Sequence, residues 1–338
     1  MKILSNVCLV CSIILGVSCT GEEISNNNQE TDNCYILKAY IGEKEPVSRA
    51  TVSNVDGKSF MWQTGDKFDM YLNDAPSTTN EFAIIDNTIS NDVNSADFSC
   101  GNFQVSENFV NYTAFYPAGK FVYGSGKYTF EMPDDVYTQT GNNSTEHLRS
   151  GLVMVANGNY NDGVYTIEFK HKASLIRFGV TNRRDVNVVI NSIKLVSTVS
   201  CFGSGYSYAG SAEESYNAGG NSINISFNSG VEIQPDYNLK SYTLAMRGDN
   251  ITDDADFHIE AELSDGTTVI SQTFKGSEIN NATGFDKANG NYWLPGYYYS
   301  FYLDLKENTL DFSGVTCSIT AWTDDSNSDK GAVTPDIN

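Results

Sequence analysis

The chain has 338 residues, and its 42 acidic residues against 21 basic ones give a formal net charge of −21 at pH 7. A surface this negative repels nucleic acid and anionic lipid, so we expect both to be poor partners and expect no binding of nucleic acid. The 40% hydrophobic content is ample for packed cores, and the length predicts two domains rather than one.

Residues 1–18 have the layout of a secretory signal peptide, with a basic start, a mostly apolar stretch over 3–15 and small residues before Cys19. The stretch is too short for a transmembrane helix, which needs about 20 apolar residues. With Cys19 at the cut site, the segment resembles a bacterial lipobox, although Gly16 stands where that motif usually has leucine. The resemblance implies acylation of Cys19, with palmitate or a similar chain. The alternative is an ordinary signal peptide with an incidental cysteine.

Two acidic residues, Glu22 and Glu23, follow this cysteine and resemble an export signal for the outer leaflet of the outer membrane. The sequence therefore predicts a surface-exposed lipoprotein of the cell outer membrane. Residues 19–33 are polar and lack aromatic side chains, which is typical of a flexible tether.

The first predicted strand covers residues 35–41, in which Tyr35, Leu37, Ala39 and Ile41 share one face. The polar, proline-containing residues 42–49 that follow predict an exposed loop.

Alternation of apolar and polar residues with a period of two continues along the chain and predicts many short strands. Turn-rich segments separate them, and the only helical turn that we expect lies near 145–152. This pattern predicts an all-β protein built from antiparallel sandwiches. We place an N-terminal domain at 34–168 and a C-terminal domain with a short polar tail at 169–338. The clearest strand segments are 222–227, 257–263, 297–305 and 315–322, and the clearest turn-rich segments are 157–163 and 202–221.

The sequence offers little chemistry for an enzyme. It contains no nucleophile elbow, zinc-protease motif, phosphate-binding loop or dinucleotide fingerprint, so we expect neither catalytic residues nor a cofactor. His147, His171 and His258 are scattered, and we expect no metal site from them. His258 falls on the polar face of its strand, which predicts a solvated side chain, whereas His171 is expected to be packed and hydrogen-bonded. A calcium-like spacing over 325–331 has a lysine where glycine is required, which opposes cation binding.

Four cysteines remain after the leader and Cys19 are set aside, namely Cys34, Cys100, Cys201 and Cys317. Four cysteines allow three pairings, and the sequence does not choose among them. Cys317 alternates with apolar residues, which favours a buried free thiol.

Several segments in order resemble the fimbrillin family, the subunits of type V pili, including Mfa-like subunits. The segments are SRATVSN (48–54), FMWQTGDKFDMYL (60–72), AFYPAG (114–119), FKHKASLIRFGV (169–180), YWLPGYYYSFYLDL (292–305) and SITAW (318–322). The resemblance implies two transthyretin-like β-sandwich domains and export as a lipoprotein. It also implies cleavage after Arg49, before Ala50, which removes the first strand. Loss of this strand would leave an apolar groove, and the resemblance implies that a neighbouring pilin subunit fills it with its own C-terminal strand.

Residues 35–41 suit this role, because their loss would leave unpaired backbone groups and apolar pockets that a partner strand could fill. The alternative is that Arg49 is a plain loop residue and the strand stays in place. The polar tail after Trp322 would be a poor donor strand, which favours a tip, accessory or anchor subunit of the fimbrium with a role in adhesion. The competing interpretation is a monomeric, lipid-anchored module that binds a glycan or a host protein. A surface glycosidase is the least favoured function.

Overall fold

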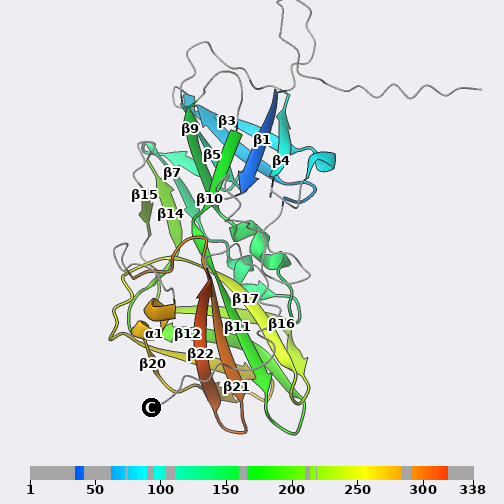
Figure 1. Cartoon of the computed structure of the whole chain (residues 1–338), viewed down its shortest axis with the longest axis vertical. Helices are drawn as coiled ribbons and strands as arrows, with labels where there is room; N and C mark the ends of the chain where they lie inside the picture. The colour runs from blue at the N-terminus through cyan, green and yellow to red at the C-terminus, as the bar shows by residue number, and fades with distance from the viewer. Residues whose placement is uncertain are drawn as a thin grey trace, which may run out of the picture. The chain divides into compact units, whose positions relative to one another are not determined.

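The computed structural model describes residues 35–41, 62–72, 75–89, 95–101, 103, 111–159, 166–209, 214–217, 219–282 and 291–318. Residues 34–338 form one compact unit. Nearly all of the regular structure is β, as predicted, and Figure 1 shows it as a set of separate sheets. No helix among these residues is long and apolar enough to cross a membrane.

Seven strands close into a barrel, so that each strand pairs with two neighbours. Around the barrel the order is β1 (Tyr35–Ile41), β10 (Thr166–His171), β9 (Met154–Asn159), β5 (Asn111–Tyr116), β2 (Lys67–Leu72), β3 (Ala75–Ile84) and β4 (Ser95–Cys100).

Two larger sheets share the second core, because buried side chains of both belong to a single hydrophobic cluster. The five-stranded sheet has the order β13 (Phe202–Gly203), β17 (Asn238–Arg247), β11 (Ala173–Asn182), β21 (Tyr298–Leu305) and β22 (Leu310–Ser318). The second has the order β19 (Thr268–Ile270), β18 (Asp256–Leu263), β12 (Val188–Ser197), β16 (Ser222–Ile233) and β8 (Thr138–Gln139), with β20 (Phe274–Lys275) paired to β18.

A small four-stranded sheet completes the β structure. Its order is β15 (Glu214–Tyr216), β14 (Gly205–Tyr208), β7 (Lys127–Glu131) and β6 (Val122–Gly124). The prediction of turns throughout 202–221 is therefore wrong in part, because β13, β14 and β15 lie in this segment. Their alternation is short and interrupted by glycine, which hides it in the sequence.

The observed faces of the strands follow the predicted alternation. In β18, Phe257, Ile259, Ala261 and Leu263 are buried, whereas Glu262 between them is exposed. Most ladders are antiparallel, and the parallel ones are β1 with β10, β11 with β21 and β16 with β8.

The predicted helical turn near 145–152 is confirmed as a 3-10 helix, η3 (Glu146–Gly151). The expectation that it is the only one is wrong, since the structure also contains η1 (Asp86–Thr88), η2 (Asp134–Tyr137) and the helix α1 (Gly276–Ala282). These elements span too few residues to show a helical period in the sequence.

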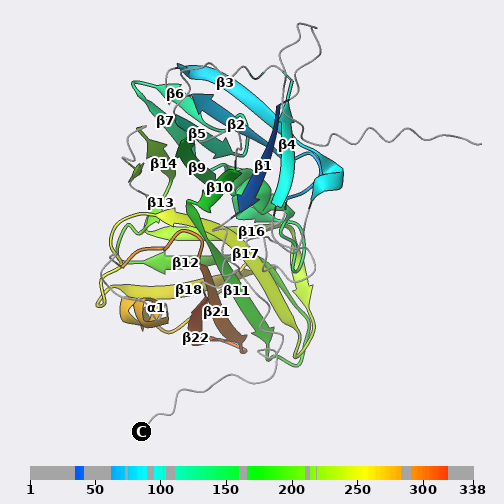
Figure 2. The same cartoon turned by 45° about the horizontal axis from the view of Figure 1, so that its top comes forward.

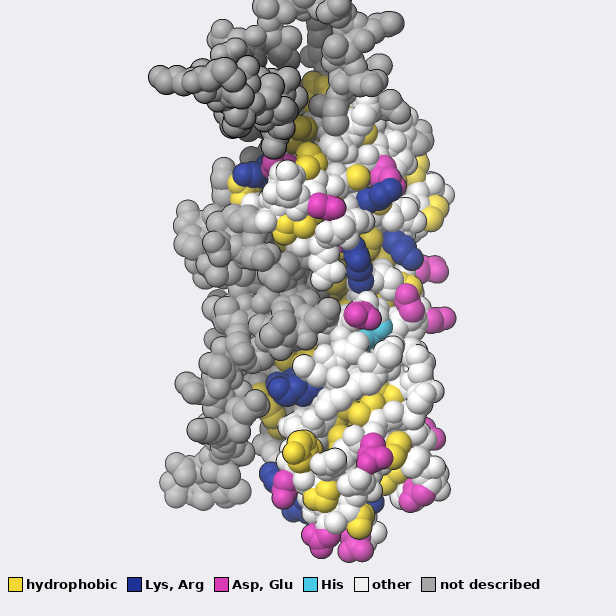
Figure 3. Space-filling model, turned by 90° about the vertical axis from the view of Figure 1, so that its right-hand side faces the viewer, with side chains coloured by type: hydrophobic (Ala, Val, Ile, Leu, Met, Phe, Trp, Pro, Cys, Tyr) yellow, Lys and Arg dark blue, Asp and Glu magenta, His cyan; other side chains and the backbone are white. Residues whose placement is uncertain are grey.

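The first core fills the barrel and extends onto one face of the five-stranded sheet, where Leu175, Leu244 and Tyr298 join it. Acidic and basic side chains lie interspersed over the described part of the face drawn in Figure 3. The division into domains at 168/169 stays a prediction.

Candidate strand-exchange groove

Strand β1 is an interior strand of the barrel. Its residues 35–40 pair antiparallel with residues 95–100 of β4, and its residues 38–41 pair parallel with residues 166–169 of β10. Figures 1 and 2 show β1 in dark blue between the cyan β4 and the green β10. The backbone donors and acceptors of β1 therefore bond on both sides, and the barrel has no open edge at this point.

Side chains of β1 alternate between the core and the outer surface. Leu37, Ala39 and Ile41 keep 1%, 0% and 3% of their surface exposed and belong to the first core, whereas Ile36 keeps 53%. Tyr35 is half-buried, and its ring lies edge-on to that of Phe103 with 5.3 Å between the centroids. Tyr35, Leu37, Ala39 and Ile41 therefore lie on the same face of β1, as predicted.

Aromatic side chains line the space that β1 covers. Phe98 of β4 is the register partner of Leu37, and Phe169 of β10 is the partner of Ile41. The indole of Trp62 packs edge-on against both rings, with centroid separations of 4.8 Å to Phe98 and 5.7 Å to Phe169. All three aromatic residues are buried, so withdrawal of β1 would open an apolar, aromatic groove between β4 and β10. Trp62 was not among the predicted site residues, because no alternation surrounds it in the sequence.

The remaining predicted residues of this mechanism lie outside the described residues. They are Cys19, Arg49 and Ala50, together with the tail that follows Ser318. Their acylation, cleavage and donor roles stay predictions.

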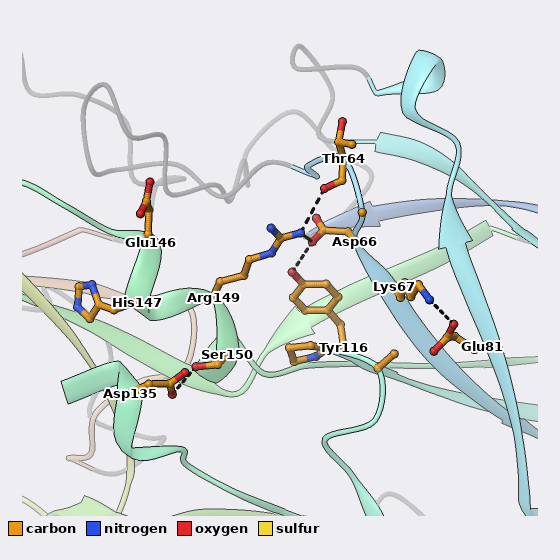
Figure 4. Close-up of a pocket in the computed structure, with 13 residues that line it drawn as sticks. Thr64, Asp66, Lys67, Glu81, Tyr116, Asp135, Glu146, His147, Arg149 and Ser150 are labelled. Carbon is orange, nitrogen blue, oxygen red and sulfur yellow. Dashed lines mark hydrogen bonds and ion pairs between the residues drawn. The ribbon is translucent and has the colours of Figure 1, made fainter. Parts of the chain in front are cut away.

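A polar pocket of about 540 Å³ lies beside the barrel, between the segment around Asp66 and η3. Its central group is the buried carboxylate of Asp66, which accepts a hydrogen bond of 2.6 Å from Arg149 and one of 2.9 Å from the hydroxyl of Tyr116 (Figure 4). Burial, together with this carboxylate, raises the pKa of Tyr116. The bonds from Arg149 and Tyr116 to Asp66 tie η3 to the barrel.

The histidines are held separately. His147 places Nε2 2.8 Å from the carbonyl oxygen of Tyr242, and burial lowers its pKa. Burial also lowers the pKa of His171, to about 3, and its Nε2 has no contact with solvent. The side chain of His258 lies on the polar face of β18 as predicted, where it keeps 32% of its surface exposed and lies 3.1 Å from Glu260. Among the described residues, no three side chains of His, Cys, Asp or Glu are grouped to hold a metal ion.

Two cysteines are free thiols in the core. Cys100 lies in β4 and Cys201 just before β13, and burial raises the pKa of Cys201 to about 11. Cys34 and the side chain of Cys317 lie outside the described residues, so the predicted thiol of Cys317 stays a prediction.

The profile of a family described as "Fimbrillin-like" matches residues 48–322. The chain belongs to the fimbrillin-like family. No curated protein sequence matches this fimbrillin.

Solved structures are similar to this chain at low identity. A candidate cell adhesion protein from Bacteroides uniformis is 13% identical with a TM-score of 0.50, and the match covers 87% of this fimbrillin and all of that chain. A candidate cell adhesion protein from Bacteroides ovatus gives 11% and 0.48 over 86% and 99% of the two chains. A fimbrial protein from Bacteroides vulgatus gives 11% and 0.39 over 85% and 99%.

Family membership assigns this fimbrillin a pilus or adhesion role at the cell surface, in assembly with other pilin subunits. Fimbrillins are structural proteins and not enzymes.

Proposed function

We propose that this fimbrillin is an outer-membrane lipoprotein, acylated at Cys19, that becomes a pilus component by strand exchange after cleavage at Arg49. Under this proposal β1 is a temporary strand. It closes the barrel of the precursor and is then replaced by a strand of a neighbouring subunit.

The observation that carries the proposal is the position of β1. The strand lies at the start of the folded unit and pairs on both sides, and it puts Leu37, Ala39 and Ile41 into the core. Loss of an interior strand costs more than loss of an edge strand, because two ladders open and buried side chains leave the core. The groove can be satisfied again only by a strand that presents apolar side chains at alternate positions.

Cleavage after Arg49 would separate β1 from the rest of the chain. In the sequence, residues 42–49 join β1 to the next segment, are polar and end on this arginine. The cut would also release the acylated Cys19, so cleavage would detach the subunit from the membrane and prepare it for assembly.

The sequence after Trp322 favours an acceptor over a donor. Its sixteen residues are mostly polar and include Gly331 and Pro335, which weaken a strand. We therefore propose a tip, accessory or anchor position in the fimbrium rather than a repeating stalk position. We also propose that residues 34–168 and 169–338 are two transthyretin-like domains.

The direct test replaces Arg49 by alanine and compares the surface material with that of the wild type. Arg49→Ala should leave the precursor uncut and absent from SDS-resistant oligomers, while wild-type material in oligomers should begin at Ala50. Lys44→Ala is the matched control, because it removes the other basic residue of the same loop. Normal assembly of Arg49→Ala, or polymer-bound wild-type protein that still begins at Cys19, would overturn the proposal.

A further inference from the structure

A second polar pocket, of about 570 Å³, is lined by no residue of β1. Its walls come from β15, from the end of β17 with residues 248–250, from Tyr292 and Pro295, and from Lys172 between β10 and β11. The volume is in the range of small-ligand sites.

Arg247 is stacked on aromatic rings in this pocket. Its guanidinium carbon lies 3.6 Å from the ring centroid of Tyr292 and 5.8 Å from that of Tyr216. Stacking fixes the plane of the guanidinium and leaves its in-plane N–H donors available, which preorganises the fork that binds a carboxylate through two hydrogen bonds.

Within the described part of the chain, the guanidinium of Arg247 makes no hydrogen bond or ion pair, and its contacts are the two rings. Two other arginines of the described residues pair with carboxylates: Arg149 bonds to Asp66, and Arg183 bonds to Asp236 and Asp304. Arg247, by contrast, presents an oriented fork at a pocket without a carboxylate partner among the described residues.

Two charged groups of the pocket pair with each other, which leaves Arg247 and Asp249 as its remaining charges. Lys172 and Glu214 neutralise each other through an ion pair of 2.5 Å. Asp249 and Asn250 are exposed at the pocket, where a carboxylate and an amide can bond to hydroxyl groups. Tyr216 adds a half-buried aromatic ring, against which the C–H face of a sugar ring can pack.

We propose that this pocket binds an acidic saccharide, in which a carboxylate on a pyranose ring pairs with Arg247. The ring of the sugar packs near Tyr216, and its hydroxyls bond to Asp249 and Asn250. The proposal does not depend on strand exchange, because no residue of β1 lines the pocket.

The experiment titrates purified protein with two ligands that differ only in the carboxylate, methyl glucuronide and methyl glucoside, and follows binding by saturation-transfer NMR and calorimetry. A methyl sialoside tests a second class of acidic sugar, and acetate, a carboxylate without a sugar ring, tests whether the sugar contributes to binding. We expect saturable binding of an acidic glycoside, at least about tenfold tighter than that of methyl glucoside or acetate.

Two variants at Arg247 separate charge from geometry. Arg247→Gln should weaken binding by at least about tenfold, and Arg247→Lys should also weaken it because the fork is lost. Arg183→Gln is the matched control and should change affinity by less than about twofold. Tyr216→Leu is a second variant, which should weaken glycoside binding without changing the charge of the pocket.

Three results would overturn the proposal. They are the absence of binding of both acidic glycosides to the wild type, equal affinity for methyl glucoside, and unchanged affinity in folded Arg247→Gln. If acetate bound as tightly as the acidic glycosides, the sugar ring would contribute nothing to the affinity and the pocket would not be a saccharide site.

Discussion

Two adjacent residues of β1, Ile36 and Leu37, lie on opposite faces of the strand, so we expect very different losses of stability when each is truncated. Leu37 has 1% of its surface exposed and faces the first core, whereas Ile36 has 53% exposed and faces outward. Truncation of each to alanine therefore removes aliphatic carbon from two different environments on the same strand. The difference between the two variants therefore measures how much the core-facing side of β1 contributes to the unfolding free energy.

The magnitude follows from burial. Leu37→Ala removes about three carbon groups from the core at about 0.8 kcal/mol each, and the cavity beside Phe98 brings the total loss of unfolding free energy to about 3–5 kcal/mol. Ile36→Ala should change the unfolding free energy by about 0.5 kcal/mol or less, since its side chain already contacts water.

The assay is equilibrium unfolding in urea, followed by the fluorescence of Trp62 in a background of Trp293→Phe and Trp322→Phe. Trp62 reports on the first core because it packs against Phe98 and Phe169. Equal losses for Leu37→Ala and Ile36→Ala, or a loss below about 1 kcal/mol for Leu37→Ala, would refute the assignment of β1 to the core.

Three further predictions concern other parts of the fold. In the same urea assay, Asp66→Asn should lower the unfolding free energy by about 1–3 kcal/mol, because it weakens the bonds from Arg149 and Tyr116. Glu81→Gln is the control: it alters the exposed pair with Lys67 and should lower the unfolding free energy by about 0.5 kcal/mol or less. Burial lowers the pKa of His171 to about 3, so the folded state binds fewer protons than the unfolded state. The unfolding free energy should therefore fall as the pH drops below about 6.5, and His171→Gln should flatten that decline. The buried Cys100 and Cys201 should resist a thiol reagent at about pH 8 until guanidinium unfolds the chain. Rapid labelling of both in native protein would contradict their burial.

Sequence alternation was sufficient to predict the class of the fold and the buried face of β1. In the run from Tyr35 to Ile41, a period of two places Leu37, Ala39 and Ile41 on one side, and burial follows the same pattern. Alternation has this predictive power because successive side chains of a strand point to opposite faces.

The partners of each strand could not be predicted in the same way. The parallel ladder between β1 and β10 joins residues that are more than a hundred positions apart, and period-two patterns do not determine strand order. Likewise, the interactions of Arg149 and Arg247 depend on which loops meet in space, so neither polar pocket is visible in the sequence.

The strand face predicted the side on which His258 lies, and neighbouring strands decide how much of it water reaches. Alternation placed its side chain on the polar side of β18, and there it keeps 32% of its surface exposed. In the six-stranded sheet β18 lies between β12 and β19, so its neighbours and Glu260 enclose the ring in part.

The proposed exchange of β1 requires that this strand can leave the barrel, and a reversible staple tests that requirement most directly. Ile36 and Ser99 are register partners on the outer face of β1 and β4, so paired cysteines at these positions lie within the reach of a disulfide. The staple is placed in a Cys34→Ser background, which removes the neighbouring thiol.

The measurement is the yield of SDS-resistant oligomers from Ile36→Cys/Ser99→Cys protein after cleavage, with and without reductant, beside the single Ile36→Cys variant. The account predicts that the oxidised double variant stays monomeric, and that reduction restores assembly to the level of the single variant. Full assembly with the disulfide intact would contradict the account, because the groove would then remain occupied by β1.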